Sequence, residues 1–324
     1  MARPTLLCVL LNYRTPEMTL RAATAALADL DAMGGELVIV DNASGDGSED
    51  MLRREVDVRG WHEGGRVRVI GSPVNGGFGA GNNIGIRAML SDGGAPDYVY
   101  ILNSDAFPDA GSIRALIDHL EATPDAGIAC SHVRGEDGQT HTTAFRFPSI
   151  AGEFEGAARL GAVSRLLSHA RVVLPQPGIT QQVDWSAGAS MMLRRSMLDD
   201  IGIFDETFFL YFEETDLCLR AARAGWWCWY VPQSRVVHIG SVSTGMKTKS
   251  RMPQYWYDSR RHYFIKNYGR VYAACALLAH VGGGLLHRLR MGLAGRKPQD
   301  PQWFLSDMMS HAITRYRLSR EDRP

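Results

Sequence analysis

The chain has 324 residues, which is enough for one large domain or two ordinary ones. Its 35 Lys and Arg balance 35 Asp and Glu, so no overall field attracts nucleic acid, and we expect no nucleic-acid partner. Five scattered cysteines without a CxxC pair argue against a disulfide framework and against a structural zinc site. Together with an apolar fraction of 45%, these features predict a globular protein of the reducing cytoplasm.

Short apolar runs alternate with helical patterns at the start of the chain. Strands are predicted at residues 6–11, 37–40, 67–70, 98–102 and 127–130, and helices at 17–31, 80–90 and 111–122. Later in the chain, a helix is predicted near 196–201 and two strands at 227–231 and 235–238. Wholly apolar strands separated by helices are typical of a mostly parallel α/β sheet with helices on both faces. Such sheets bind ligands at the carboxyl ends of their strands.

Polar residues and glycines follow four of the predicted strands. The four endings are Asn12, Tyr13 and Arg14, then Asp41, Asn42, Ala43 and Ser44, then Asn75, Gly76 and Gly77, then Asn103, Ser104 and Asp105. Turns favour several of these residue types in any protein. Four such endings at one edge of a sheet nevertheless predict a site of nucleotide size.

The glycine-rich run NGGFGAGNN occupies residues 75–83. It is not a dinucleotide fingerprint, because Asn82 stands at the third glycine position, and the chain contains no G-K-[ST] P-loop. The backbone N–H groups of the helix that follows could still receive a diphosphate. The alternative interpretation is a tight turn from strand to helix.

Asp105 is the acid that the run ILNSDAF delivers to the sheet edge. A carboxylate in this position suits a divalent cation, since Mg²⁺ takes one or two carboxylates together with substrate phosphates. An N-cap or turn residue is the alternative. His238 ends a later apolar run, VVHIGS, where a histidine is more often a hydrogen-bonded core or turn residue than a ligand. It becomes a candidate ligand only as a partner of Asp105.

The segment FFLYFEETDLCLR, residues 208–220, places three carboxylates directly after a run of aromatics. An acid at the edge of an apolar pocket is desolvated, and Glu213, Glu214 or Asp216 could then accept a proton in catalysis. The alternative is structural. Acids in the first turn of a helix stabilise its dipole, and Asp216 could pair with Arg220 at i,i+4.

The motifs VDNASGDGS, NGGFGAGNN, LNSDAFP, WSAGASMMLRR, FDETFFLYFEETDLCLRAARAGW and VVHIGS occur in this order over roughly residues 5–245. As a set they resemble the family 2 glycosyltransferases of the GT-A fold, in particular the rhamnosyltransferase-like branch that acts on bacterial surface polysaccharides. The resemblance implies an α/β GT-A domain over 1–240, with a nucleotide-sugar half to about residue 130 and an acceptor half after it. We expect a mainly helical extension over 241–324, and we interpret residues 131–182 as an excursion over the mouth of the site.

The resemblance also implies roles for single residues on the donor side. The residues expected to contact the nucleotide sugar are Asn12, Tyr13, Arg14, Asp41, Asn75, Gly77, Phe78, Asn103 and Ser104. The D-x-D metal motif of the family falls on residues 103–105. Asn stands here in place of the first acid, so Asp105 would carry the metal contact on this loop, with His238 as a second ligand.

On the acceptor side, the family's E-D pair falls on Glu213 and Glu214, which implies Glu214 as the catalytic base. Glu stands here where Asp is usual, so Glu213 and Asp216 stay open as alternatives. Trp185 and Gly188 match the wall of the family's acceptor pocket.

The implied reaction is an inverting, metal-dependent transfer, with Mg²⁺ or Mn²⁺, from a dTDP- or UDP-sugar to a saccharide or a lipid-linked saccharide. The sugar of this branch is rhamnose. One alternative is a nucleotidyltransferase, which should carry a basic glycine-rich loop near its N-terminus, and LNYRTP is not such a loop. The other alternative is a non-catalytic protein that binds sugar nucleotides or polysaccharides.

No signal peptide is predicted, because the first apolar run is too short. We predict no membrane-spanning helix, since the nearest candidate, residues 271–286, contains His280 and three consecutive glycines. Basic and aromatic residues interleave before it: Arg260, Arg261, Lys266 and Arg270 with Tyr257, Tyr263, Phe264 and Tyr268. This pattern suits a peripheral contact with the inner face of the plasma membrane. A helix that packs on the domain is the alternative, and a homodimer is compatible with the sequence.

Overall fold

The structure is a computed structural model that describes residues 3–240, 250–298 and 300–321. The chain forms two compact units, and the division does not follow chain order. The first unit is Met1–Phe145 with Val173–Thr244, and the second is Arg146–Val172 with Gly245–Pro324. Residues 146–172 therefore belong with the C-terminal helices. The assignment of 1–130 and 131–240 to donor and acceptor halves stays a prediction.

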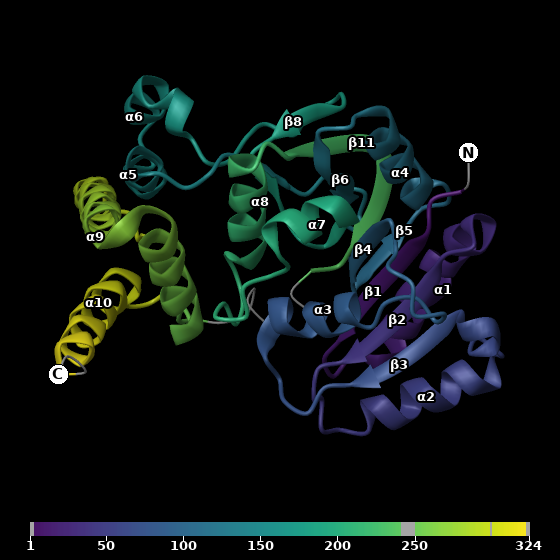
Figure 1. Ribbon diagram of the computed structural model, residues 1–324. Helices are drawn as coiled ribbons and strands as arrows, with labels where there is room; N and C mark the ends of the chain where they lie inside the picture. The colour runs from purple at the N-terminus through teal and green to yellow at the C-terminus, as the bar shows by residue number, and fades with distance from the viewer. Residues whose placement is uncertain (1–2, 241–249, 299, 322–324) are drawn as a thin grey trace. The chain divides into compact units, whose positions relative to one another are not determined.

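A nine-stranded sheet forms the centre of the first unit (Figure 1). Its strands are β1 (Leu6–Asn12), β2 (Glu36–Asp41), β3 (Val67–Gly71), β4 (Tyr98–Asn103), β5 (Ala106–Pro108), β6 (Ala126–Arg134), β8 (Gln181–Val183), β10 (Ser190–Arg194) and β11 (Trp227–His238). They follow the order β3-β2-β1-β4-β10-β6-β11-β5, and β8 pairs with β11. The first four strands are parallel, as is the β6–β11 pair, whereas β10, β5 and β8 add antiparallel pairs. A small second sheet joins β7 (Ala144–Phe145) to β9 (Trp185–Ser186).

The helices of the first unit lie against both faces of this sheet (Figure 1). They are α1 (Pro16–Met33), α2 (Ser48–Val58), α3 (Gly77–Arg87), α4 (Ser112–Ala122), α7 (Arg195–Ile201) and α8 (Glu213–Arg223), with a short 3-10 turn at Glu63–Gly65. Helix α1 begins with proline in its first turn and ends at Gly34, whose φ of 71° forms the usual left-handed cap.

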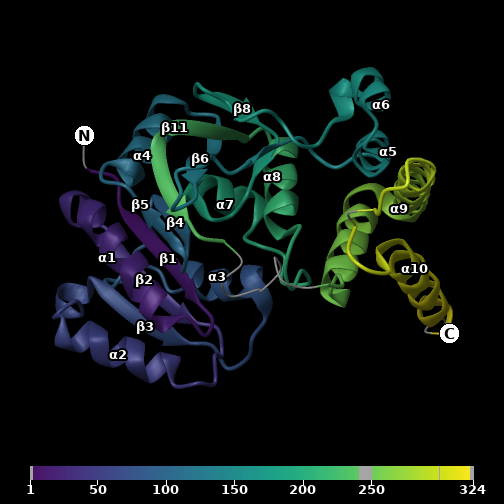
Figure 2. The same cartoon turned by 180° about the vertical axis from the view of Figure 1, so that it is seen from behind.

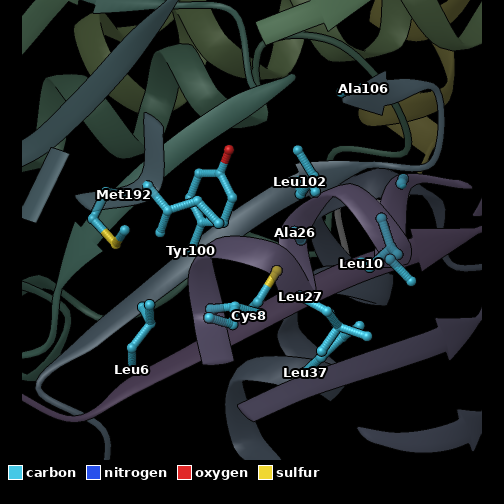
Figure 3. Packing of buried hydrophobic residues seen from close by; sticks show 14 of the residues in the cluster. Leu6, Cys8, Leu10, Ala26, Leu27, Leu37, Tyr100, Leu102, Ala106 and Met192 are labelled. Carbon is cyan, nitrogen blue, oxygen red and sulfur yellow. The ribbon is translucent and has the colours of Figure 1, made fainter. Parts of the chain in front are cut away.

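Alternate residues of β1 decide which helices cover which face. Leu6, Cys8 and Leu10 point into the main apolar core with α1, as Figure 3 shows. On the opposite face, α3 approaches β1 so closely that a Cβ on Gly85 would lie 2.3 Å from Val9 Cγ1. Glycine at this position therefore lets the helix that follows the NGG turn lie directly on the strand that ends at Asn12.

The predicted strands and helices of the first unit are all present, with differences at some boundaries. Residues 227–238 form one strand with irregular pairing to β6, where the sequence predicted two strands. Helix α3 begins at Gly77 instead of residue 80 because Gly77 adopts a φ of 88° that only glycine tolerates well. The sequence did not predict α2, whose exposed surface gives a weak apolar signal, or β10, which lies between β4 and β6.

The second unit is helical (Figure 2). It contains α5 (Ile150–Ala158), α6 (Gly161–Leu166), a 3-10 turn at Ser168–Ala170, α9 (Gln254–Leu293) and α10 (Phe304–Glu321). Within it, α5 and α10 both contact α9. The helical extension agrees with the expectation, but part of the predicted excursion, residues 146–172, belongs to this unit.

Helix α9 has a non-helical residue, Gly269, with φ 86° and ψ 168°. Two of the three consecutive glycines later in the helix are packing positions, whereas Gly282 is exposed. A Cβ on Gly283 would lie 2.6 Å from the Phe154 carbonyl oxygen of α5, and one on Gly284 would lie 2.9 Å from Leu305 of α10. Helix α9 is long and apolar enough to cross a membrane by length and composition alone, in spite of His280 and the three glycines. The absence of a membrane-spanning helix stays a prediction. Gly283 and Gly284 are contact points with α5 and α10.

Candidate active site

The carboxyl ends of β1 and β2 meet in a buried hydrogen-bond network. Asn12 Nδ2 donates to Asp41 Oδ1 at 2.6 Å, and Asp41 also accepts from the Ser44 hydroxyl at 2.6 Å and the Ser44 N–H at 3.0 Å. Thr19 in α1 donates to Asn12 Oδ1 at 2.7 Å. Asn12 and Asp41 are both buried, so their side chains shape the floor of this strand end.

Arg14 continues the same edge with a strained backbone. Its φ is 58°, and Ala43 on the neighbouring loop has a φ of 53°, both in the left-handed region that non-glycine residues seldom adopt. The Arg14 N–H donates to the Ser44 hydroxyl at 2.9 Å, and its guanidinium lies 5.1 Å from the centre of the Tyr13 ring. This geometry holds a cation and an aromatic ring together where a nucleotide would meet them.

The NGG turn is locked onto the segment that precedes the acid pair. Asn42 donates to Asn75 Oδ1 at 3.0 Å, and the Phe78 N–H donates to the Phe209 carbonyl at 2.9 Å. A Cβ on Gly77 would lie 1.8 Å from that same carbonyl oxygen, so the turn requires glycine here. Farther along α3, the Asn83 amide donates to the Phe204 carbonyl at 2.8 Å. Two segments more than 120 residues apart thus form one rigid wall.

Asp105 and His238 lie side by side, as the antiparallel pairing of β5 with β11 requires. His238 Nε2 is 3.0 Å from Asp105 Oδ1, and the Gly240 N–H donates to Asp105 Oδ2 at 3.0 Å. Burial opposes ionisation of Asp105, but the hydrogen bond and charge of His238 outweigh it and lower the pKa of the carboxyl. Asp105 is therefore an anion at neutral pH.

The side chains of Asn103, Asp105 and His238 offer ligand atoms that fit a divalent cation. Asn103 Nδ2 is 3.5 Å from His238 Nε2, and Asn103 Oδ1 is buried with no hydrogen-bond partner among the described residues. Carboxylate and amide oxygens suit Mn²⁺ or Mg²⁺, and the imidazole favours Mn²⁺ over Mg²⁺. The described residues hold no cluster of three or more His, Cys, Asp or Glu that could bind a metal without help. A cation here would thus depend on phosphate oxygens for the rest of its shell.

The acid pair begins α8 under unusual backbone conditions. Tyr211 and Phe212 have φ values of 70° and 69°, and such strain in bulky residues tends to occur at functional sites. Burial raises the pKa of Glu214 to about 7. Burial, and then the charge of Glu214, raises the pKa of Glu213 well above its ordinary value. One oxygen of each carboxyl is buried without a hydrogen-bond partner among the described residues.

Gly188 connects the acid pair to the other strand ends. Its N–H lies near the Glu214 carboxyl, where it favours the ionised form and lowers the pKa, and a Cβ on Gly188 would lie 3.2 Å from the Phe78 ring. The next residue, Ala189, accepts a hydrogen bond from the Asn103 N–H at 3.1 Å. The NGG turn, the end of β4 and Glu214 therefore meet around residues 188–189.

Asp216 lies apart from this convergence. Its carboxylate is fully buried and accepts from Arg220 Nε at 2.9 Å. Arg220 also donates to the carbonyls of Ile201 and Ile203, at 2.7 and 2.8 Å. The pair joins α8 to the loop after α7, which matches the structural alternative for Asp216.

Trp185 forms an aromatic stack in the small second sheet. Its ring lies 4.2 Å from that of Phe145, with an angle of 19° between the planes. The stack fixes the orientation of the indole three residues before Gly188.

Sequence reasoning missed several residues of the site. Thr19 and Phe145 contact candidate residues directly, and Phe209 binds the NGG turn through its backbone. The ring of His141 lies 6.3 Å from that of His238 and was also not predicted. Ser44, in contrast, belongs to the predicted strand ending after β2 and donates to Asp41.

The sequence model described as Glycosyl transferase family 2 matches residues 8–202. A rhamnosyltransferase of Mycobacterium tuberculosis, N-acetylglucosaminyl-diphospho-decaprenol L-rhamnosyltransferase, is 30% identical over 224 residues, which cover 67% of this chain and 70% of that protein. The rhamnosyltransferase WbbL of Escherichia coli is 30% identical over 167 residues, covering 50% and 60%. The chain belongs to glycosyl transferase family 2, and it is an inverting glycosyltransferase.

Solved structures show the same fold. The mannosyltransferase PcManGT from Pyrobaculum calidifontis, in complex with GDP-Man and Mn²⁺, matches 98% of this chain and 81% of its own, with a TM-score of 0.59 and 15% identity. GalNAc-T7 with UDP, GalNAc and Mn²⁺ also has a TM-score of 0.59, at 13% identity, over 95% of this chain and 54% of its own. The predicted GT-A fold is thereby confirmed.

Proposed function

We propose that this enzyme transfers a rhamnose-type sugar from a dTDP- or UDP-linked donor to a lipid-linked saccharide, with Glu214 as the catalytic base. The observation that carries the proposal is the setting of Glu214. Burial raises its pKa to about 7, and it lies beside Gly188, in the segment whose next residue, Ala189, is hydrogen-bonded to the end of β4.

Glu214 suits the base role better than the other two acids. A general base works best when its pKa is close to the working pH, and the shift of Glu214 places it there. Asp216 is committed to Arg220, and Glu213 is the more deeply buried of the two glutamates. We therefore assign Glu214 to remove the proton from the acceptor hydroxyl, whose oxygen then attacks the anomeric carbon.

The leaving diphosphate needs positive charge at the opposite side of the sugar. Asp105 and His238, with Asn103 beside them, are the residues that would hold a divalent cation. When bound, the cation would neutralise charge on the diphosphate. In the proposal, Arg14 and Tyr13 contact the nucleotide, while Asn75, Gly77 and Phe78 form the wall on which it packs.

The acceptor follows from the named relatives. The Mycobacterium tuberculosis protein is named for transfer of L-rhamnose to N-acetylglucosaminyl-diphospho-decaprenol. An acceptor of that class keeps its saccharide next to a membrane, so we include a peripheral membrane contact at the cytoplasmic face in the proposal. The stacked Trp185 and Phe145 rings offer an apolar wall for the acceptor sugar. A homodimer stays a prediction.

A thermal-shift screen of the full chain tests the donor. dTDP-rhamnose, UDP-sugars and GDP-sugars are compared with and without Mn²⁺ or Mg²⁺, and transfer to a soluble saccharide-diphosphate analogue is measured with the best donor. We expect metal-dependent stabilisation by dTDP-rhamnose and transfer of its sugar. Stabilisation by GDP-sugars alone would reject the donor assignment, and binding without transfer would favour the non-catalytic alternative.

A further inference from the structure

The part of α9 that follows Gly269 presents an apolar face outward. Every exposed position from 271 to 293 is apolar or glycine, which is unusual for a helix face in water. Five large side chains on this face are between 58% and 83% exposed: Val271, Leu278, Leu285, Leu289 and Leu293. Cys275, also exposed, lies among them. The spacings of seven, seven, four and four residues align them in one stripe.

The opposite face of the same helix is packed against the second unit. Ala276, Gly283 and His287 are buried there, and Gly283 touches α5. His280 Nδ1 lies 2.6 Å from Glu153 of α5, which also binds Arg260 at 2.8 Å. This face also carries Leu277 and Val281, which pack on the apolar cluster that α9 forms with α10, so it is occupied. The outward stripe is therefore not explained by the packing of α5 or α10 on α9.

The charge that α9 itself carries beside the stripe is positive. The sequence has no Asp or Glu from 259 to 299, but it has eight Lys and Arg in that range. Arg288 and Arg290 lie on either side of the stripe at Leu289, where Arg288 is 3.8 Å from Asp300 and Arg290 donates to the Arg159 carbonyl at 2.6 Å. Arg270 at one end and Arg296 and Lys297 at the other are exposed.

We propose that this stripe is the surface by which the enzyme docks on anionic lipid, with α9 lying in the membrane interface. A basic amphipathic helix with a continuous apolar face binds in this way, and anionic headgroups complement the flanking charges. A second copy of the chain would instead bring two basic surfaces together. This inference deepens the proposed function. It rests on that function in one respect, namely that a lipid-linked acceptor brings the enzyme to a membrane.

The helix lies in the interface and does not cross the bilayer. The segment from 270 to 293 is about 36 Å long, enough to span. A crossing helix would have to place His280, His287, Arg288 and Arg290 in hydrocarbon, together with the helices packed on that face. An interfacial helix inserts only its stripe and keeps the packed face in water.

Co-sedimentation of the full chain with vesicles tests the proposal. Phosphatidylcholine vesicles are compared with vesicles in which a quarter of the lipid is phosphatidylglycerol. We expect binding to the anionic vesicles that weakens with salt. Leu278→Glu or Leu289→Glu should each lower the affinity by about tenfold or more, since each places a charge in the apolar layer. Val58→Glu, at an equally exposed apolar residue of α2, is the matched control and should change nothing.

Cys275 gives a direct probe of insertion, because the other four cysteines are buried. An environment-sensitive fluorophore on its thiol should shift to the blue with anionic vesicles and be quenched by lipids that carry a spin label in the acyl chain. A shift that depends on protein concentration without lipid would assign the stripe to self-association. An apolar signal without lipid at any dilution would show that the chain itself covers it. Resistance to carbonate extraction would show a spanning helix. Each of these outcomes overturns the proposal.

Transfer activity separates this inference from the proposed function. Leu278→Glu should keep full transfer to a soluble acceptor analogue while losing vesicle binding. If vesicle binding is absent in the parent chain but transfer occurs, the docking surface is wrong and the function stands. If binding occurs and no sugar is transferred, the docking surface stands and the function is wrong.

Discussion

Two largely buried glutamates, one in each compact unit, have pKa values shifted in opposite directions. Glu153 in the helical unit meets Arg260 at 2.8 Å and His280 at 2.6 Å. Burial pushes its pKa upward, but the Arg260 charge and the His280 contact prevail and hold the pKa at about 2. Burial raises the pKa of Glu214 in the sheet unit to about 7, because nearby backbone N–H groups lower it only in part and no cation contributes. A buried carboxyl with cationic partners is structural, whereas one without them is ready to take a proton.

Removing the proton acceptor should give the largest effect. Glu214→Gln keeps the shape of the side chain, but the amide cannot take the proton from the hydroxyl group of the acceptor saccharide. We therefore expect kcat to fall by about 10²–10⁴-fold. Donor binding, followed by thermal shift, should survive. Glu63→Gln on an exposed turn is the control and should retain full activity. An unchanged kcat in Glu214→Gln would contradict the assignment of Glu214 as the catalytic base, and with it the contrast between Glu214 and Glu153.

Glu153→Gln should destabilise the helical unit by roughly 3–5 kcal/mol, because it leaves Arg260 buried without its counter-charge. Urea unfolding followed by circular dichroism measures the change. The double variant Glu153→Leu with Arg260→Met should recover part of the loss. A single variant as stable as the parent would mean that the ion pair does not hold α5 to α9.

The two glutamates should also give separate pH dependences. Glu214 must be ionised to act, so the rate should rise about tenfold per pH unit below pH 7 and level off above it. Glu153 has a lowered pKa, so its contribution to stability is complete above the ordinary value of 4.5 and is lost as the pH falls toward 2. Rate profiles and acid unfolding curves measure the two. A rate limb centred near pH 4.5 would contradict the setting of Glu214.

The smallest expected effect is a gain. The pKa of Glu213 is raised in the folded state, so its ionised form is disfavoured there and stability falls as the pH rises through that value. Glu213→Gln should therefore stabilise the protein by about 1 kcal/mol at pH 8, or about 2–4 °C in Tm, and by less at pH 5. Differential scanning calorimetry at both pH values tests this, and equal gains would argue against a raised pKa.

The strands and the polar strand ends were predictable because each rests on a local pattern. Runs such as LLCVLL predict a buried strand, and Asn12 and Asp41 follow from where the runs stop. The order β4-β10-β6 was not predictable, since the antiparallel insertion of β10 depends on contacts between distant segments. The docking of Gly77 on Phe209 and the stack of Phe145 on Trp185 are equally non-local. Sequence spacing narrowed the acids to three candidates, and the family resemblance favoured Glu214, but the hydrogen bond from Arg220 to Asp216 and the burial of Glu214 were visible only in the structure.

The helical unit is built from two separate segments of the chain, and this has a consequence for its folding during synthesis. Helix α5 leaves the ribosome about 100 residues before α9, an interval of about 5–20 s at ordinary rates of translation. During this time, Glu153 has neither Arg260 nor His280 as a partner, and the surface that will meet Gly283 is open. The sheet unit can fold while residues 146–172 are still without their partner helices, but the helical unit can form only after the last part of the chain emerges. A shortened chain that ends near residue 240 would leave α5 permanently without its partner, and such a product should be a substrate for cellular proteases.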